Sequence, residues 1–168
     1  FIDSTALKVC HFKREHSNRV FDGMATKGKT TLGWFFGFKL HIIINDKGEI
    51  ISFVITQGNI DDRYPLSMAS FISRVSGKLY ADRGYVSQKL AGILFVDGIH
   101  FVAKMRNNMK GGELPLQDRV MLRKRAVIES VNDELKNICQ IEHTRHRCFT
   151  NFITNLIAGL LAYSFLPK

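Results

Sequence analysis

The chain has 168 residues and a mass of 19.1 kDa, which suits a single domain. With 45% hydrophobic and 23% charged residues it can bury a core, and this composition excludes a disordered, collagen-like or fibrous chain. Lysine and arginine number 24 against 15 acidic residues, so the formal charge is +9. That charge indicates either a polyanionic partner, nucleic acid first among them, or merely a soluble basic surface.

Three cysteines are too few for a disulfide framework, so we expect a reducing, cytoplasmic environment. The longest apolar stretch, residues 152–166, is shorter than a membrane span and contains Thr154, Asn155 and Gly159. It therefore predicts a buried helix and no membrane association. The chain begins with Phe1 in a strand-like segment, so we expect an upstream region to be missing.

The first third of the chain predicts strands. Residues 1–10 form a strand, and the polar, basic, glycine-containing residues 11–31 form a loop. Aromatic and β-branched residues at 34–44 predict a second strand. Residues 45–48 are typical of a turn and 49–56 of the partner strand, which completes a hairpin.

Helices and strands then alternate. The expected elements are a helix from Asp61 or Asp62 to about residue 75, a strand at 78–81, a helix from Ser87 to Asp97 closed by Gly98, a strand at 100–104, a loop at 107–115, and helices at 117–138 and 149–165. This order predicts an α/β fold with one mixed sheet, antiparallel in its first three strands and parallel afterwards, flanked by helices. It is the ribonuclease H-like topology.

Three acids far apart in the sequence stand where one site could form. Asp3 lies in the first strand, Asp82 follows the strand at 78–81, and Glu129 lies in the long helix. Ligands usually bind at strand ends in open α/β sheets. Converging carboxylates repel one another unless a cation such as Mg²⁺ neutralises them, and two such ions about 3.5–4 Å apart promote displacement at phosphorus. The acids therefore predict phosphodiester chemistry, although each alone could be a cap, turn or surface residue.

The helix at 117–138 is expected to have two faces. Arg125, Glu129, Asn132 and Lys136 share one stripe. The apolar side is formed by Val120, Val127, Ile128, Val131, Leu135 and Ile138. One face would pack on the sheet while the other places an acid between two cations; the alternative is a solvated ladder of charges.

Four segments carry a family resemblance: Asp3-Ser4-Thr5, Gly58-Asn59-Ile60-Asp61-Asp62, Ala81-Asp82-Arg83-Gly84-Tyr85, and the helix around Glu129. In them the chain resembles the DDE transposases of bacterial insertion sequences, in the retroviral-integrase and ribonuclease H-like superfamily. Many relatives carry Tyr-x2-Arg-x3-Glu-x6-Lys in the last segment. Arg125, Glu129 and Lys136 keep this spacing, whereas Leu122 replaces the tyrosine.

The resemblance implies that Asp3, Asp82 and Glu129 are the catalytic triad and hold two Mg²⁺ or Mn²⁺ ions. It implies a single catalytic domain over residues 1–168, lacking an N-terminal DNA-binding region, in a homo-oligomeric synaptic complex at the bacterial nucleoid. The substrates would be double-stranded transposon ends and target DNA: water cleaves at the end, and the freed 3′-hydroxyl attacks the target. The alternatives are a nuclease or resolvase on the same fold, which cuts without joining, and an inactive DNA-binding remnant.

Basic residues outside the triad are candidate DNA contacts. Arg125, Asn132 and Lys136 flank Glu129, with Lys136 directed at phosphates or terminal bases. Further candidates are Lys104, Arg106 and Lys110 in a strand-to-loop patch, Lys13, Arg14, Arg19, Lys27 and Lys29 in the first loop, and Arg145 and Arg147 near the last helix. Each group could equally be a solvated surface run.

Other residues invite rival interpretations. The aromatic run Trp34, Phe35, Phe36 and Phe38 could stack on bases, but the pattern favours core strand residues. The residues Cys139, His143, His146 and Cys148 are spaced too tightly to favour one tetrahedral zinc ion. Asp61 and Asp62 are expected to be helix caps, and His41 and His100 to be strand residues in the core or at its edge.

Overall fold

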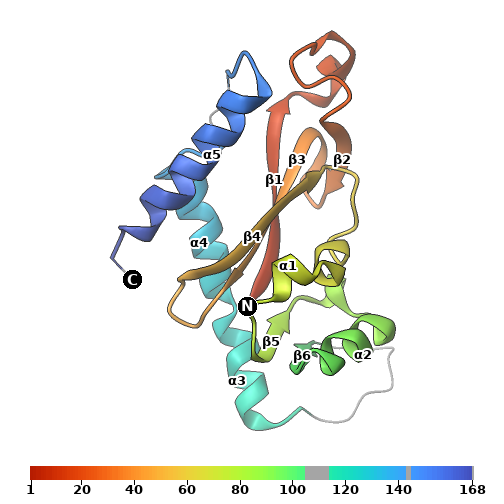
Figure 1. The fold of residues 1–168 in the computed structure, drawn as a ribbon, viewed down its shortest axis with the longest axis vertical. Helices are drawn as coiled ribbons and strands as arrows, with labels where there is room; N and C mark the ends of the chain where they lie inside the picture. The colour runs from red at the N-terminus through yellow and green to blue at the C-terminus, as the bar shows by residue number, and fades with distance from the viewer. Residues whose placement is uncertain (105–113, 143–144, 168) are drawn as a thin grey trace. The chain divides into compact units, whose positions relative to one another are not determined.

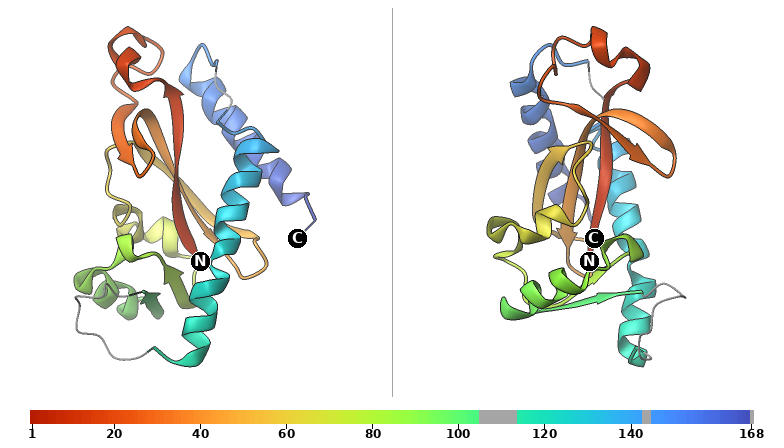
Figure 2. Two further views of the ribbon diagram at one scale, coloured as in Figure 1. Left: turned by 180° about the vertical axis from the view of Figure 1, so that it is seen from behind. Right: turned by 90° about the vertical axis from the view of Figure 1, so that its right-hand side faces the viewer.

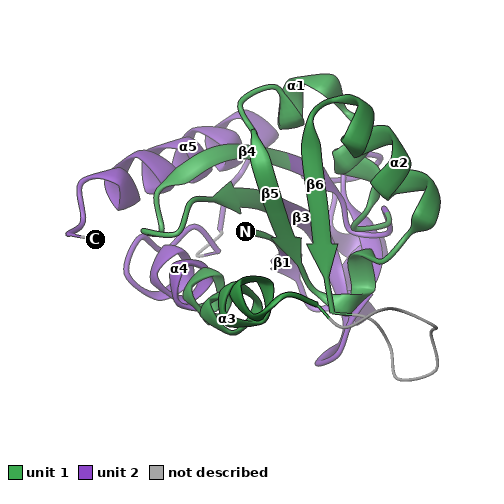
Figure 3. Ribbon diagram, turned by 90° about the horizontal axis from the view of Figure 1, so that it is seen from below, with its two compact units in different colours: residues 1–3, 41–54, 61–129 green, residues 4–40, 55–60, 130–168 purple. Residues whose placement is uncertain are grey.

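The computed structural model describes residues 1–104, 114–142 and 145–167. Clustering of the chain gives two compact units, coloured separately in Figure 3. Unit 1 contains residues 1–3, 41–54 and 61–129, and unit 2 contains residues 4–40, 55–60 and 130–168. Each unit contains both strand and helix residues, so the predicted α/β class is confirmed.

The first sheet is antiparallel and has β3 as its hub. Its strands are β1 (Ile2–Cys10), β2 (Thr26–Thr30), β3 (Gly33–Ile44) and β4 (Ile50–Gln57), and β3 is paired with the other three (Figures 1 and 2). The Phe1 amino group donates to the Ile44 carbonyl at 2.7 Å, and the Ile44 N–H donates back at 2.9 Å. This reciprocal pair is the antiparallel pattern. The three strands expected in this region are confirmed.

The second sheet is a parallel pair, β5 (Gly77–Ala81) and β6 (Ile99–Ala103). The connecting helix α2 (Gln88–Val96) begins as expected, because the Ser87 hydroxyl accepts the Leu90 N–H. Gly98 follows it with φ +75°, a conformation that favours glycine. The strands were correctly predicted, but among the described residues they form two sheets rather than one mixed sheet.

Unit 1 has its own apolar core. It combines residues of β1 and β3, namely Ile2 and Ile43, with residues of the parallel pair and α2, including Leu79, Ala81 and Leu94. Further members come from the short helices η2 (Tyr64–Ser67) and α1 (Ala69–Ile72). The strand residues just before Asp3 and Asp82 thus belong to one buried cluster.

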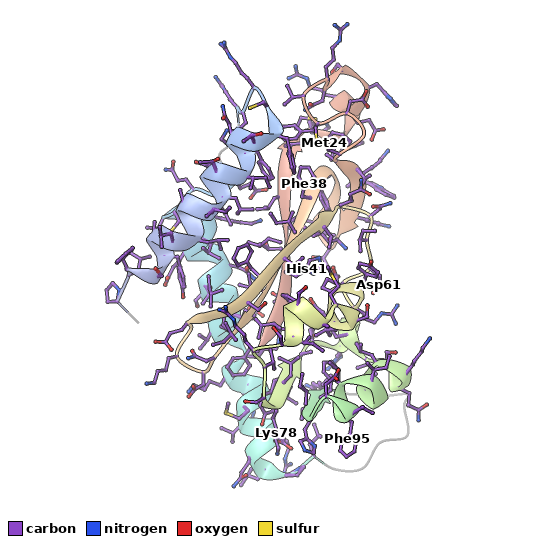
Figure 4. All side chains as sticks on the ribbon, viewed as in Figure 1. Met24, Phe38, His41, Asp61, Lys78 and Phe95 are labelled. Atoms are coloured by element: carbon purple, nitrogen blue, oxygen red, sulfur yellow. The ribbon has the colours of Figure 1, made fainter. Side chains whose placement is uncertain are left out.

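Unit 2 is built around aromatic rings. Phe38, labelled in Figure 4, stacks on Phe152 with 5.1 Å between ring centroids, and Phe21 packs edge-on against both. Phe152 comes from α5 (Phe149–Ser164), which confirms the predicted last helix. The predicted burial holds for one side of the helix, where Phe152, Leu156 and Leu160 are buried, but not for the other, where Ile157 and Leu161 are exposed. No helix in the described ranges is long and apolar enough to cross a membrane.

The expected loop at 11–31 was wrong in part, because it contains β2 and the 3-10 helix η1 (Phe12–Ser17). In β2 the buried, inward position is Gly28, and exposed lysines stand on either side. A Cβ at Gly28 would overlap the Gly58 carbonyl oxygen and come within 2.6 Å of Phe35 Cζ. A strand whose inward residue is glycine has no hydrophobic alternation, so the pattern could not reveal it.

The helix expected from 61 to 75 was also wrong. Met68 is extended (φ −89°, ψ 111°) and separates η2 from the single turn of α1. Asp61 does not cap a helix: it accepts the Arg63 N–H at 2.9 Å and pairs with the Arg63 guanidinium at 2.6 Å. The local turn made by this side chain replaces a helix start.

The helix expected at 117–138 is two helices, α3 (Leu116–Lys124) and α4 (Ala126–Asn137). At the junction the Ile128 N–H bonds to the Arg125 carbonyl, an i to i+3 bond that tightens the turn. Ile128, Val131 and Leu135 are buried as predicted, but Val120 and Ile138 are exposed. The stripe expected along one continuous helix is therefore divided between two helices. The loop predicted at 107–115 lies almost wholly outside the described residues.

A buried carboxylate joins α3 to β5. Asp118 accepts hydrogen bonds from Lys78 Nζ at 2.7 Å and from the Tyr80 hydroxyl at 2.8 Å (Lys78 is labelled in Figure 4). The bond from Lys78, and secondarily that from Tyr80, lowers the pKa of Asp118. Burial, together with the bond to Asp118, raises the pKa of Tyr80 to about 12. The charged carboxylate is therefore the form that the folded chain favours.

Replacing Gly28 by alanine is expected to destabilise the fold by about 1–3 kcal/mol, because the new methyl group meets backbone and a packed ring. The matched control is Gly92→Ala inside α2, where an added Cβ meets nothing within 4 Å. That change is expected to be neutral or to stabilise by up to about 1 kcal/mol. Urea unfolding measures the free energy of unfolding of both variants. Equal effects of the two changes would contradict the close packing of Gly28 against Gly58 and Phe35.

The Asp118→Asn variant is expected to be less stable than the parent chain at pH 7. Since the folded pKa of Asp118 lies below its unfolded value, the stability that its charge provides is present above about pH 4 and lost as the pH falls through the folded pKa. The difference in free energy of unfolding between the parent chain and Asp118→Asn should therefore become smaller below about pH 4. Urea unfolding at pH 7, 5, 4 and 3 measures it, and a difference that stays constant would count against the ionic role.

Candidate functional site

The three predicted acids all belong to unit 1. Asp3 is the second residue of β1, and Asp82 directly follows β5 as the N-cap residue of η3 (Arg83–Tyr85), with an exposed side chain. Glu129 lies in the first turn of α4. Asp3 is thus in the first strand, Asp82 follows a strand and Glu129 is on a helix, as the sequence predicted, but Glu129 lies near the start of α4 rather than mid-way along one long helix.

A ring contact joins the segments just before Asp3 and Asp82. Phe1 and Tyr80, each two residues before one of the acids, have ring centroids 5.9 Å apart. Ile2 and Ala81, each one residue before, share the buried cluster of unit 1. Consecutive Cα atoms are about 3.8 Å apart, so these contacts limit how far the two carboxylates can separate.

The third acid has a cationic partner. Glu129 Oε1 lies 3.2 Å from Arg125 Nη2, one helical turn earlier. The Glu129 side chain is 65% exposed, whereas that of Arg125 is 16% exposed. Arg125 is therefore fixed beside the acid, and Glu129 keeps access to solvent.

The chemistry of the three acids suits a hard divalent cation, because every candidate ligand is a carboxylate. In the described ranges of the chain, however, no three His, Cys, Asp or Glu side chains are grouped closely enough to hold a metal ion. The arrangement thus brings the strands of Asp3 and Asp82 together without forming a complete coordination group.

Two of the predicted DNA contacts on α4 belong to unit 2 and have internal roles. Lys136 Nζ donates to the Ala6 carbonyl at 2.8 Å and pairs with Glu142 at 3.1 Å, and its side chain is 23% exposed. Asn132 is buried, with 9% of its surface exposed. Lys136 thus makes contacts within unit 2 and Asn132 is buried, and contact of either residue with DNA stays a prediction.

The remaining candidates are divided by what the structure describes. Lys104 is exposed just after β6, while Arg106 and Lys110 lie outside the described residues. His41 is buried in β3 as expected, and His100 is exposed against Phe95. Phe35, Phe36 and Phe38 are core residues as predicted, but Trp34 is exposed.

The structure gathers basic residues that the sequence lists in separate clusters. Arg14, Arg19 and Arg145, with His146, line a surface hollow of about 440 Å³ in unit 2. The other lining residues are Val9, Cys10, Ser17, Asn18, Val20 and Phe21, so the described lining contains no carboxylate. Sequence reasoning missed this convergence, because nothing in the spacing of residues 14, 19 and 145 signals it.

An α/β chain of this charge, with acids at strand ends and arginines around one hollow, has the features of a nucleic-acid-processing enzyme. A family model described as Transposase DDE domain matches residues 1–149. The chain therefore belongs to the DDE transposase family, and the family implies DNA as the substrate. Comparison with curated proteins and with solved structures gives no match.

Removing two charges of the hollow should weaken DNA binding. The double variant Arg19→Ala/Arg145→Ala is expected to lower the slope of log affinity against log salt on duplex DNA by about 1.8, or 0.9 for each lost phosphate contact. The control Arg74→Ala/Lys89→Ala removes the same charge from exposed positions of unit 1. Fluorescence anisotropy at several salt concentrations measures the slopes. Equal slopes for the two double variants would show that the arginines of the hollow have no specific role in DNA binding.

Proposed function

We propose that this chain is the catalytic domain of an insertion-sequence transposase, which cleaves DNA at transposon ends and joins the 3′-hydroxyl to target DNA. In the first step water adds at a phosphodiester, and the 3′-oxygen leaves as a hydroxyl. In the second step that hydroxyl attacks a target phosphodiester and displaces a target 3′-oxygen. We propose a ribonuclease H-like fold, a bacterial cytoplasmic site of action at the nucleoid, and a homo-oligomeric complex on the DNA.

One observation carries the proposal within the family: Phe1 contacts Tyr80, and each of these residues precedes a predicted catalytic acid by two positions. Residues two apart in a strand share a face, so the contact supports Asp3 and Asp82 approaching each other. The antiparallel strands β4, β3 and β1 and the parallel pair β5 and β6 supply the strands that a ribonuclease H-like sheet requires.

Asp3, Asp82 and Glu129 are the residues proposed to hold the divalent cations, Mg²⁺ or Mn²⁺. When bound, such ions supply charge stabilisation at phosphorus and a more acidic water. Arg125 pairs with Glu129 in the described structure, and the Glu129 carboxylate, 65% exposed, would remain accessible to a cation. The guanidinium of Arg125 beside it would suit a DNA phosphate, because its fork can donate two parallel hydrogen bonds.

The activity test uses Asp82→Asn, which keeps the size of the side chain and removes its charge. With element-end duplexes and Mn²⁺, the variant is expected to lose at least about 100-fold in both cleavage and strand transfer. The control Asp97→Asn removes an exposed acid at the end of α2 and should act like the parent chain. Cleavage without joining would identify a nuclease instead.

Cation binding is tested separately by thermal unfolding. Mn²⁺ is expected to raise the melting temperature of the parent chain and of Asp97→Asn, and to have less effect on Asp82→Asn and Glu129→Gln, because ligands that bind only the folded chain stabilise it. An unchanged melting temperature in the parent chain, together with normal strand transfer by Asp82→Asn, would overturn the proposal.

A further inference from the structure

An exposed tryptophan and two exposed lysines lie together on one side of the β2–β3 hairpin of unit 2, next to the buried Phe36. Lys29 lies directly opposite Trp34 in the antiparallel register, and Lys27 lies opposite Phe36. Opposed residues share a face, as do residues two apart, so Lys27, Lys29 and Trp34 lie on the same side. Lys27 Nζ is 5.3 Å and Lys29 Nζ 5.5 Å from the centroid of the Trp34 ring, both within cation–π range.

Packing on the other side of the hairpin fixes the register of β2 against β3. Gly28 is opposite Phe35, which is buried, and a side chain at Gly28 would collide with Gly58. A shift of register by one residue would exchange the two faces and place a lysine against this backbone. The close packing at Gly28 thus fixes the register, and with it the position of Trp34, 52% exposed, opposite Lys29.

The indole ring and the two ammonium groups together indicate which kind of ligand could bind here. A nucleotide in single-stranded DNA offers an aromatic base face and two flanking phosphates, which match one indole ring and two ammonium groups. In a duplex both faces of each base are covered by its neighbours, so only an unpaired or flipped-out base can stack on the ring. Glu15 lies 3.8 Å from Lys27 and reduces its charge, so Lys29, directly opposite the ring, is expected to hold the closer phosphate.

We propose that this hairpin is a binding site for an unpaired DNA base, with Trp34 as the stacking surface and Lys27 and Lys29 as the contacts for the adjoining phosphates. The site takes its ligand class from the proposed function and contains none of the three acids. When DNA binds, the lysines leave the ring for the phosphates and the base takes their place. The hairpin then holds a separated strand by a contact independent of base sequence.

The chain provides its own probe, because Trp34 is its single tryptophan. A base stacked on the indole is expected to quench its fluorescence. The titration uses the whole chain, EDTA, and a mixed-sequence single strand that carries no fluorophore. A strand of the same length with abasic positions provides the phosphates without the bases, and it is expected to bind more weakly and to quench little.

Affinity is measured by anisotropy with labelled single-stranded and duplex DNA. Trp34→Ala is expected to weaken single-strand binding about tenfold or more, with little change on duplex, while Trp34→Phe keeps most of the affinity. Lys27→Gln/Lys29→Gln should lower the salt slope on single strands by about 1.4. The matched control is Phe95→Ala, which removes an exposed aromatic ring of unit 1 (Figure 4) and should change neither.

Equal quenching by the abasic strand, or unchanged single-strand affinity in Trp34→Ala, would overturn the inference. Circular dichroism of each variant separates loss of folding from loss of binding, and Trp34→Phe retains a ring if alanine unfolds the hairpin. No cation or cleavage enters these measurements. A failure of the catalytic proposal therefore appears in the strand-transfer assay alone, and a failure of the stacking site appears here alone.

Discussion

Nearly every residue of β3 is buried, and a buried strand must have its backbone groups hydrogen-bonded along both edges. β1, β2 and β4 supply those partners. This requirement explains why a segment as polar as Thr26–Thr30 becomes a strand at all: its backbone completes the edge of β3, and its only inward residue has no side chain to accommodate. The same requirement fixes the start of β1 through the paired bonds of Phe1 and Ile44, and with it the position of Asp3.

The electrostatics of the acids follow from this arrangement. The apolar cluster of unit 1 contains the residues directly before Asp3 and Asp82, so burial of these residues holds the two segments close together. The Glu129 carboxylate has a charged partner of its own in Arg125, whose side chain is largely buried. A carboxylate with a fixed guanidinium partner needs no metal ion to be stable in the resting chain.

The sequence predicted those elements in which local pattern and tertiary packing agree. The aromatic, β-branched run of β3, the turn at Asn45 to Gly48, and the Ser87 and Gly98 boundaries of α2 each contain their own signal. Prediction failed at two places where a side chain, or the lack of one, changed the local backbone: Gly28 left β2 without an apolar pattern, and Asp61 formed a turn with Arg63. It also failed at the break between α3 and α4, which no residue pattern marked. For the site, candidate acids, whose catalytic role stays a prediction, could be proposed from the sequence by family resemblance. The contact of Phe1 with Tyr80 and the meeting of Arg19 with Arg145 at one hollow could not, because both depend on long-range packing.

Trp34 shows why an aromatic residue must be judged by its neighbours rather than by its type. Trp34 and Phe38 are four residues apart in β3 and therefore lie on the same face of the strand. Phe38 nevertheless is buried and packs against the rings of Phe21 and Phe152, whereas Trp34 is exposed. Exposure alone does not mark Trp34 as a candidate binding residue, because Phe95 and Phe165 are also exposed. The difference lies in the facing strand, where Lys27 and Lys29 both reach the indole. Two ammonium groups next to one ring repel each other, and this repulsion opposes their contact with the ring. In the proposed complex, the phosphates of a DNA strand would attract both ammonium groups away from the indole. The ring face would then be open to a base of that strand.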